Sequence, residues 1–141
     1  MTREETLAFF AKREDAWRQR DPAALALGHA EDCTVESPMF STVKGRDAIQ
    51  RSYESLFQSF PDWDHVNDPP LIDGDRVARP FTARATHVGK FMGLQGTGRR
   101  FEVRGVMLTD MKDGLIAHER RIYDFAGLLM QVGVLRGKPG F

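Results

Sequence analysis

The spacing of the apolar side chains changes once along this chain, and the change limits which folds the chain can adopt. Up to Phe60 the apolar residues recur with helical spacing, whereas beyond Pro61 they alternate with polar residues as in strands. Two Asp–Gly pairs, at 73–74 and 113–114, are typical of tight turns between paired strands. Helices followed by a run of antiparallel strands indicate an α+β domain whose helices cover one face of a curved sheet.

Three helices are expected before the change of spacing. Thr2 and Glu5 form a capping box at the start of the first helix, which should end near Arg20. The stretch DPAALALGH then begins a second helix, with an aspartate as N-cap and a proline in the first turn. The stretch GRDAIQRSYESLFQSF predicts a third helix, which the following proline ends.

Strands should make up most of the remaining chain. A short strand is expected in the stretch CTVESP, between the second and third helices. The later strands are expected at 65–72, 76–87, 99–111 and 115–123. A sheet that curves around a few helices leaves an apolar concavity, and small molecules bind in such pockets.

The residues that could line this pocket are large and mostly apolar. The predicted set consists of Trp17, Tyr53, Phe57, Trp63, Phe81, Phe91, Met92, Met107 and Tyr123. The alternative is that these side chains form an ordinary hydrophobic core, because a core is built from the same residue types.

The charge balance argues against two classes of partner. Lys plus Arg and Asp plus Glu number 20 each, so the chain has no net basic field to attract nucleic acid or an anionic membrane. No apolar run approaches the roughly 20 residues of a membrane span.

With 141 residues we expect a single domain, 1–141, around one core. The lone cysteine, Cys33, excludes an internal disulfide, and we expect it to be a buried structural thiol in a reducing cytoplasm.

Four stretches carry a resemblance to a known family. They are FPDWDHV, THVGKFMGLQGTGRRFEVRGV, DGLIAHERRIYD and LLMQVG, in this order along the chain. Together they resemble the SnoaL-like polyketide cyclases, a branch of the nuclear-transport-factor-like superfamily that also contains ketosteroid isomerases, scytalone dehydratase and limonene epoxide hydrolase. The resemblance runs from the first helix to about Gly133. It implies a cone-shaped α+β barrel with a deep pocket, usually dimeric, that uses no metal and no organic cofactor.

The chain departs from the cyclases at the residues on which their chemistry depends. The resemblance places Arg121 where the cyclases have an acid/base aspartate on the last strand. It places Met107 where they have a histidine, and Gly105 where they have a glutamine. Because function depends on the site and not on the fold, the resemblance alone does not assign the cyclase activity to this chain.

Strand alternation suggests what could replace the missing residues. Glu119, Arg121 and Tyr123 fall on one face of the strand 115–123, and the family places position 121 toward the pocket. Glu119 could then take a proton from carbon beside a carbonyl, and Arg121 could stabilise the enolate. The alternative is a salt bridge on a wet sheet face, which would contribute about 0–1 kcal/mol.

Two further acids are candidate catalytic residues. Glu36 falls in the first strand, where family members place a polar pocket residue, although it could be a surface acid on an edge strand. Asp62 follows the third helix, where it could instead cap a turn. Asp64 is a third acid nearby. Asp124 is expected to cap the helix that begins at Phe125.

These residues leave three functional hypotheses. The first is a cofactor-independent enzyme that cyclises, isomerises or dehydrates a hydrophobic polyketide- or terpenoid-like ketone. The second is an epoxide-opening enzyme that uses Glu119, Arg121 and one further acid. The third is a small-molecule-binding domain without turnover. In each case we expect a small hydrophobic ligand and a homodimer formed by sheet faces, because the strand 99–111 is apolar on both sides.

Overall fold

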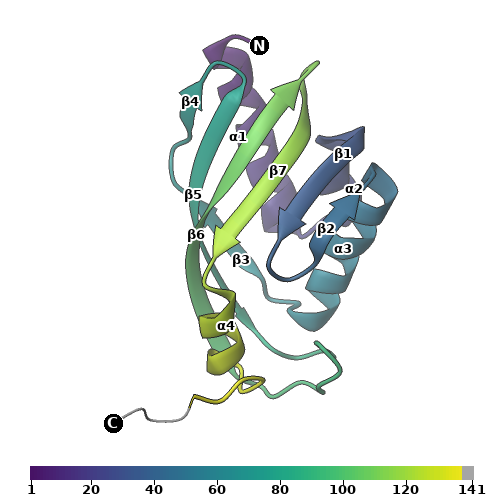
Figure 1. The fold of residues 1–141 in the computed structure, drawn as a ribbon, viewed down its shortest axis with the longest axis vertical. Helices are drawn as coiled ribbons and strands as arrows, with labels where there is room; N and C mark the ends of the chain where they lie inside the picture. The colour runs from purple at the N-terminus through teal and green to yellow at the C-terminus, as the bar shows by residue number, and fades with distance from the viewer. Residues whose placement is uncertain (138–141) are drawn as a thin grey trace.

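The computed structural model describes residues 1–137 and shows helices packed against one face of a curved sheet (Figure 1). The helices are α1 (Arg3–Gln19), α2 (Pro22–Leu27), α3 (Arg46–Ser59) and α4 (Phe125–Gln131). The strands are β1 (His29–Ser37), β2 (Ser41–Lys44), β3 (Asp64–Asn67), β4 (Leu71–Asp73), β5 (Arg76–Thr86), β6 (Arg100–Lys112) and β7 (Leu115–Tyr123). The predicted α+β class and the three N-terminal helices are confirmed.

The helix starts follow from their capping residues. Thr2 and Glu5 make the predicted capping box at α1, and the Asp21 side chain accepts a hydrogen bond from the Ala24 N–H at α2. The Asp124 side chain caps α4 by accepting from the Gly127 N–H at 2.9 Å, as predicted. These caps fix where the three helices begin, and the Asp124 cap begins α4 directly after β7.

The sheet is mixed and strongly curved, as expected, but it does not close into a complete barrel. Its strands lie in the order β2-β1-β7-β6-β5-β3, and β4 also pairs with β5. All pairs are antiparallel except β1 with β7, which run parallel. Since β2 and β3 end the order without pairing to each other, the sheet curves around the helices but does not close.

The strand expected at 65–72 is two strands. β3 ends at Asn67 and β4 begins at Leu71, and both pair with β5. Pro69 and Pro70 lie between them, and proline has no N–H to donate to the ladder. The first strand is longer than expected, because β1 starts at His29 and not at Cys33.

Alternation along the long strands separates an inner from an outer face. On β6 the side chains of Phe101, Val103 and Met107 are buried against the helices, while Val106 and Leu108 face outward and are partly exposed. The core therefore lies between the inner face and helices α1, α2 and α3. No helix within residues 1–137 is long and apolar enough to cross a membrane.

Candidate functional site

A small cavity lies between the helices and the inner face of the sheet, and we call it the interior cavity. Its volume is about 30 Å³, which is room for about one water molecule. It is lined by Trp17, Ser37, Met39, Phe40, Leu56, Trp63, His65, Phe81, Val103, Met107, Arg121 and Tyr123. Arg121 is the cationic side chain in this mostly apolar wall.

Arg121 is held in place by two hydrogen bonds. Its Nε donates to Oε2 of Glu119 at 2.8 Å, and its Nη2 donates to Oη of Tyr53 at 2.8 Å. The side chain is 8% exposed. Burial alone would lower the pKa of Arg121, but the nearby Tyr53 and Glu119 more than offset it, so the pKa lies above its usual value. The guanidinium is thus a fixed and permanent positive charge.

Glu119 lies behind Arg121 and is fully buried. Its Oε1 accepts a hydrogen bond from Nη2 of Arg79 at 3.0 Å, so each oxygen is bound by a different guanidinium. Burial would raise the pKa of Glu119, but Arg121 and the other nearby cationic groups hold it well below the usual value. The carboxylate is therefore ionised. It does not line the interior cavity, and its hydrogen bond to Nε orients Arg121.

A chain of hydrogen bonds extends from Arg121 into the helices. Oη of Tyr53 also accepts from Nη2 of Arg13 at 3.2 Å, so both of its lone pairs are used. Its own proton must then point to Nε2 of His29, 3.1 Å away. Burial lowers the pKa of His29 to about 3, and the neutral ring donates from Nδ1 to Sγ of Cys33 at 3.4 Å.

Cys33 ends this chain as a structural thiol. It is fully buried, as predicted, and burial raises its pKa to about 12. A protonated, buried thiol is a poor nucleophile. The chain from Arg121 to Cys33 therefore fixes side chains and supplies no nucleophile to the interior cavity.

His65 forms part of the cavity wall but has no free basic nitrogen. Its ring is stacked between Trp17 and Phe81, with centroids 4.0 and 4.9 Å away. Nδ1 accepts a hydrogen bond from Nε1 of Trp63 at 3.4 Å, so Nε2 carries the proton that it donates to Oδ1 of Asn67 at 3.2 Å. Burial lowers the pKa of His65 to about 3. The ring is neutral and serves as a flat wall.

Tyr123 is the proton donor available at the cavity. Burial raises its pKa to about 12, so the phenol is protonated at neutral pH. The end of β7, which carries Tyr123, and the turn between β1 and β2, which carries Met39 and Phe40, line the cavity together.

An entrance depression on the surface leads to Arg121. Its volume is about 330 Å³, and it is lined by Glu36, Ser37, Pro38, Ser41, Thr42, Arg120, Arg121 and Ile122. Ser37 and Arg121 line both this depression and the interior cavity. A ligand that approached between β1 and β7 would therefore reach these two side chains first.

The structure brings together part of the predicted pocket. Trp17, Trp63, Phe81, Met107 and Tyr123 line the interior cavity together with Arg121. The remaining predicted lining residues do not. Tyr53 and Phe57 pack edge-on against Trp17 and stack on each other, Phe91 is buried beside Phe60, and Met92 is exposed.

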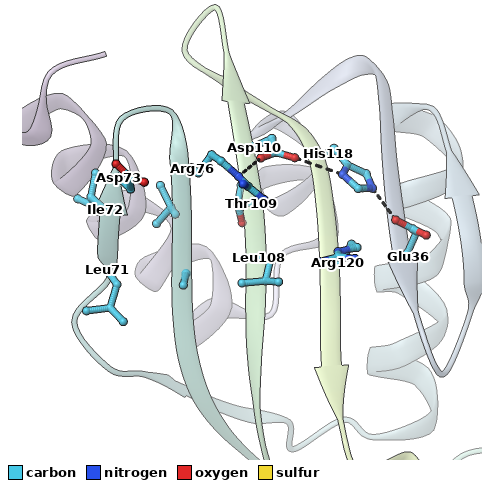
Figure 2. A pocket seen from close by; sticks show the side chains of 12 residues that line it. Glu36, Leu71, Ile72, Asp73, Arg76, Leu108, Thr109, Asp110, His118 and Arg120 are labelled. Carbon is cyan, nitrogen blue, oxygen red and sulfur yellow. Dashed lines mark hydrogen bonds and ion pairs between the residues drawn. The ribbon is translucent and has the colours of Figure 1, made fainter.

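None of the three predicted catalytic acids lines the interior cavity: Glu119 lies behind Arg121, and Glu36 and Asp62 lie elsewhere. Glu36 is on the outer face of the sheet, where its Oε2 is 2.6 Å from Nε2 of His118 (Figure 2). Asp62 accepts hydrogen bonds from the N–H and Oγ1 of Thr86, each at 2.7 Å, and so ties a turn to β5. Asp64 is exposed at the start of β3.

Other residues of the site were not predicted. Ser37, Met39 and Phe40 reach the cavity because the turn after β1 folds over it, and no local pattern signals such a fold. Arg13 could have been found, since Phe10, Arg13 and Trp17 share one face of α1 and all three are buried. A cation on the apolar face of a helix indicates a buried polar network.

Comparisons with known proteins agree with this architecture. Residues 10–132 match the family model described as SnoaL-like polyketide cyclase. AclR from Streptomyces galilaeus is 27% identical, with a TM-score of 0.80 over 97% of this chain and 85% of that one. IdmH from Streptomyces antibioticus is 26% identical, with a TM-score of 0.74 over 89% and 96%. TsrD from Streptomyces laurentii is 22% identical, with a TM-score of 0.82 over 96% and 99%, and shows the fold alone. A comparison with curated proteins found no match.

Proposed function

The chain belongs to the SnoaL-like polyketide cyclase family, and we propose that it is a cofactor-independent enzyme acting on a hydrophobic polyketide- or terpenoid-like ketone. The reaction would be a cyclisation, isomerisation or dehydration that passes through an enolate or alkoxide. Its place would be the cytoplasm, where the thiol of Cys33 remains reduced.

One observation carries the proposal: a fixed guanidinium stands in the wall of an apolar cavity. Arg121 is oriented by Glu119 and Tyr53, so it needs no rearrangement when negative charge develops on a substrate oxygen. Pre-oriented cations of this kind are among the largest contributions to enzyme rates, because the surrounding dielectric is low. The family's usual aspartate is absent at this position, and the guanidinium would act by stabilising charge instead of moving a proton.

The remaining steps can be assigned to other polar groups of the cavity. In an aldol cyclisation, a carbon beside a carbonyl loses a proton, and the resulting enolate carbon attacks a second carbonyl. Arg121 would stabilise the enolate oxygen, and the Tyr123 phenol would give its proton to the new alkoxide and regain one from the water that had taken the carbon-bound proton. Among residues 1–137 no carboxylate lines the cavity, so we assign the first proton transfer to a cavity water. This suits substrates whose reacting carbon lies between two carbonyls and is therefore acidic.

A ligand-binding domain without turnover is the second candidate. The observation that favours it is the same lack of a carboxylate in the cavity wall of the described chain. The epoxide-opening hypothesis has less support, because neither Glu36 nor Asp62 lines the interior cavity, and Glu36 is engaged by His118 on the outer face.

The test compares the arginine of the cavity with an exposed arginine on β6. Arg121→Lys removes the planar fork of the guanidinium, and we expect it to lower kcat/KM on a β-polyketone panel by about 10²–10³. Arg104→Lys is the matched control, since Arg104 is exposed and lines neither the interior cavity nor the entrance depression, and its kcat/KM should equal that of the wild type. Equal activity of both variants would exclude Arg121 from the chemistry. Binding of these ketones without turnover by the wild type would favour the binding domain.

A further inference from the structure

The interior of the protein holds more positive than negative charge. Three guanidinium groups are buried, those of Arg13, Arg79 and Arg121, and Glu119 is the one carboxylate buried with them in the described chain. The neighbouring rings of His29 and His65 are neutral. Two buried positive charges therefore have no buried counter-charge, although charged groups inside proteins are normally paired.

The hydrogen bonds among these groups do not remove the imbalance. Arg13 and Arg121 both donate to Oη of Tyr53, at 3.2 and 2.8 Å, and a phenol oxygen is neutral. Glu119 binds Arg79 and Arg121 at once, so a single negative charge serves two cations. Arg79 also lies over the ring of Phe10, 4.2 Å from its centroid, which is a weaker interaction than an ion pair. The missing partner of this cluster is an anion.

Arg121 is the member of the cluster that an anion in the interior cavity could reach. It is the one of the three arginines that lines the interior cavity and the entrance depression within the described chain. Its bonds to Glu119 and Tyr53 use Nε and Nη2, and no hydrogen bond among residues 1–137 involves Nη1. At the entrance, Glu36 is engaged by His118, while Arg120 adds positive charge. An approaching anion thus meets two arginines.

A second donor in the cavity wall also lacks a partner. Trp17 is 2% exposed and lines the interior cavity, and its Nε1–H makes no hydrogen bond within the described chain. The indole is stacked on His65 and packs edge-on against Tyr53 and Phe57, so its orientation is fixed. Buried N–H groups are rarely left unpaired, and those that are call for an explanation.

We propose that the occupant of the interior cavity is an organic oxyanion, either a carboxylate or the ionised enol of a β-diketone, held by Arg121 and the Trp17 N–H. This proposal rests on the proposed function, because it concerns the same cavity. It narrows the expected substrates from neutral ketones to anionic ones. Such a ligand supplies the negative charge that the cluster lacks and an acceptor for the indole. The cavity must widen to admit it, and the turn carrying Met39 and Phe40 covers the side that would open.

Matched pairs of ligands test the charge directly on the wild-type protein. Naphthoate and naphthamide have similar shapes and differ in charge. Dimedone is largely ionised at neutral pH, whereas its derivative with two methyl groups on the carbon between the carbonyls cannot form the acidic β-diketone enol and stays neutral. Calorimetry should give at least about ten-fold tighter binding for the charged member of one or both pairs, as expected for charge-assisted hydrogen bonds. The pair that shows the larger ratio identifies the carboxylate or the enolate as the preferred oxyanion.

Trp17→Phe tests the second donor, because it keeps an aromatic ring and deletes the N–H. We expect the variant to weaken binding of the anion by about ten-fold and to leave binding of its neutral partner unchanged. A thermal melt of the unliganded variant checks that the fold is intact. If that variant is unstable, the wild-type comparison of the ligand pairs still decides the proposal.

The outcomes separate this inference from the proposed function. Equal or tighter binding of the neutral members, or no binding of any anion in the two pairs, would overturn the inference while leaving the turnover of ketones unaffected. Anion-selective binding without turnover of any ketone would support the inference and argue against the enzyme. Loss of selectivity in Trp17→Phe would support the assigned donor, and unchanged selectivity would remove Trp17 from the site.

Discussion

Glu119 is the residue on which the buried charges of this protein depend. It binds Arg79 at 3.0 Å and Arg121 at 2.8 Å, and all three side chains are almost completely withdrawn from water. Met107 lies between the two arginines, since it pairs with Arg79 on β5 and with Arg121 on β7. The carboxylate thus links β7 to β5 across the inner face of β6.

Replacing Glu119 by glutamine should destabilise the protein strongly. The change keeps the shape of the side chain but leaves two buried guanidiniums without a counter-charge, and loss of one partner of a buried ion pair typically costs about 3–5 kcal/mol. Glu102→Gln is the matched control, because it breaks the exposed Arg84–Glu102 pair on the same sheet. That control should cost about 0–1 kcal/mol. Urea denaturation measures both, and similar losses for the two variants would contradict the role assigned to Glu119.

The buried histidines predict a loss of stability in mild acid. The pKa values of His29 and His65 fall from 6.5 in the unfolded chain to about 3 in the folded one, because burial disfavours the charged rings. Between these values the unfolded state binds more protons, so the free energy of unfolding decreases as the pH falls. The slope should approach about 1.4 kcal/mol per pH unit for each histidine. Glu119, whose pKa is also lowered, acts in the same direction at lower pH.

Urea denaturation between about pH 7 and pH 4 checks this slope. His65→Gln removes one titrating group while keeping a polar side chain, so its curve should be flatter than that of the wild type. His118→Gln serves as the comparison, because His118 lies on the outer face and is partly exposed, and its curve should keep the wild-type slope. A wild-type stability that stays constant over this range would show that the two rings are not held neutral by burial.

At the scale of single elements, helix caps and strand alternation could be predicted from the sequence, because both depend on residues that are close together in the chain. The capping residues Thr2, Asp21 and Asp124 placed three helix starts, and alternation placed Glu119 and Arg121 on one face of β7. Each of these depends on residues a few positions apart. The inward direction of that face came from the family resemblance. The sequence therefore sufficed for the helix starts and for the long strands β5, β6 and β7.

Non-local pairing explains what the sequence did not predict. The parallel pairing of β1 with β7 joins residues about eighty positions apart, and it turns Glu36 to the outer face beside His118. Arg79 meets Glu119 because of strand register across β6 and not because of any motif. The same holds for the turn at Met39, which covers the cavity only after β1 has paired. Site residues that depend on such contacts could not be assigned from spacing alone.

At the scale of the whole molecule, the outer face of the sheet has the composition of an interface. Strand register places Pro80, Val106 and Ile122 in one row across β5, β6 and β7, with Leu108 in the next. Charged pairs lie beyond both ends of this apolar centre. They are Arg84–Glu102 at one end and the network of Arg76, Asp110, His118 and Glu36 at the other (Figure 2). An apolar centre with a polar rim is typical of protein interfaces.

We expect this face to form a homodimer. A two-fold contact brings the same patch of both copies together, so the two apolar centres would meet while the charged ends lie at the rim. The depression of about 520 Å³ shown in Figure 2, lined by Leu108, His118 and Arg120 among others, offers room for side chains of the second copy. Sedimentation should therefore give about twice the chain mass of 16.0 kDa.

Leu108→Asp tests the proposed interface, because it places a charge at the apolar centre, where burial on association would be unfavourable. We expect the variant to sediment as a single chain of 16.0 kDa with its circular dichroism unchanged. Val88→Asp is the matched control, since Val88 is an exposed apolar residue in the loop after β5, away from this face, and this variant should remain dimeric. A wild-type mass of 16.0 kDa at every concentration would refute the dimer, and a Leu108→Asp variant that stays dimeric would move the interface to another surface.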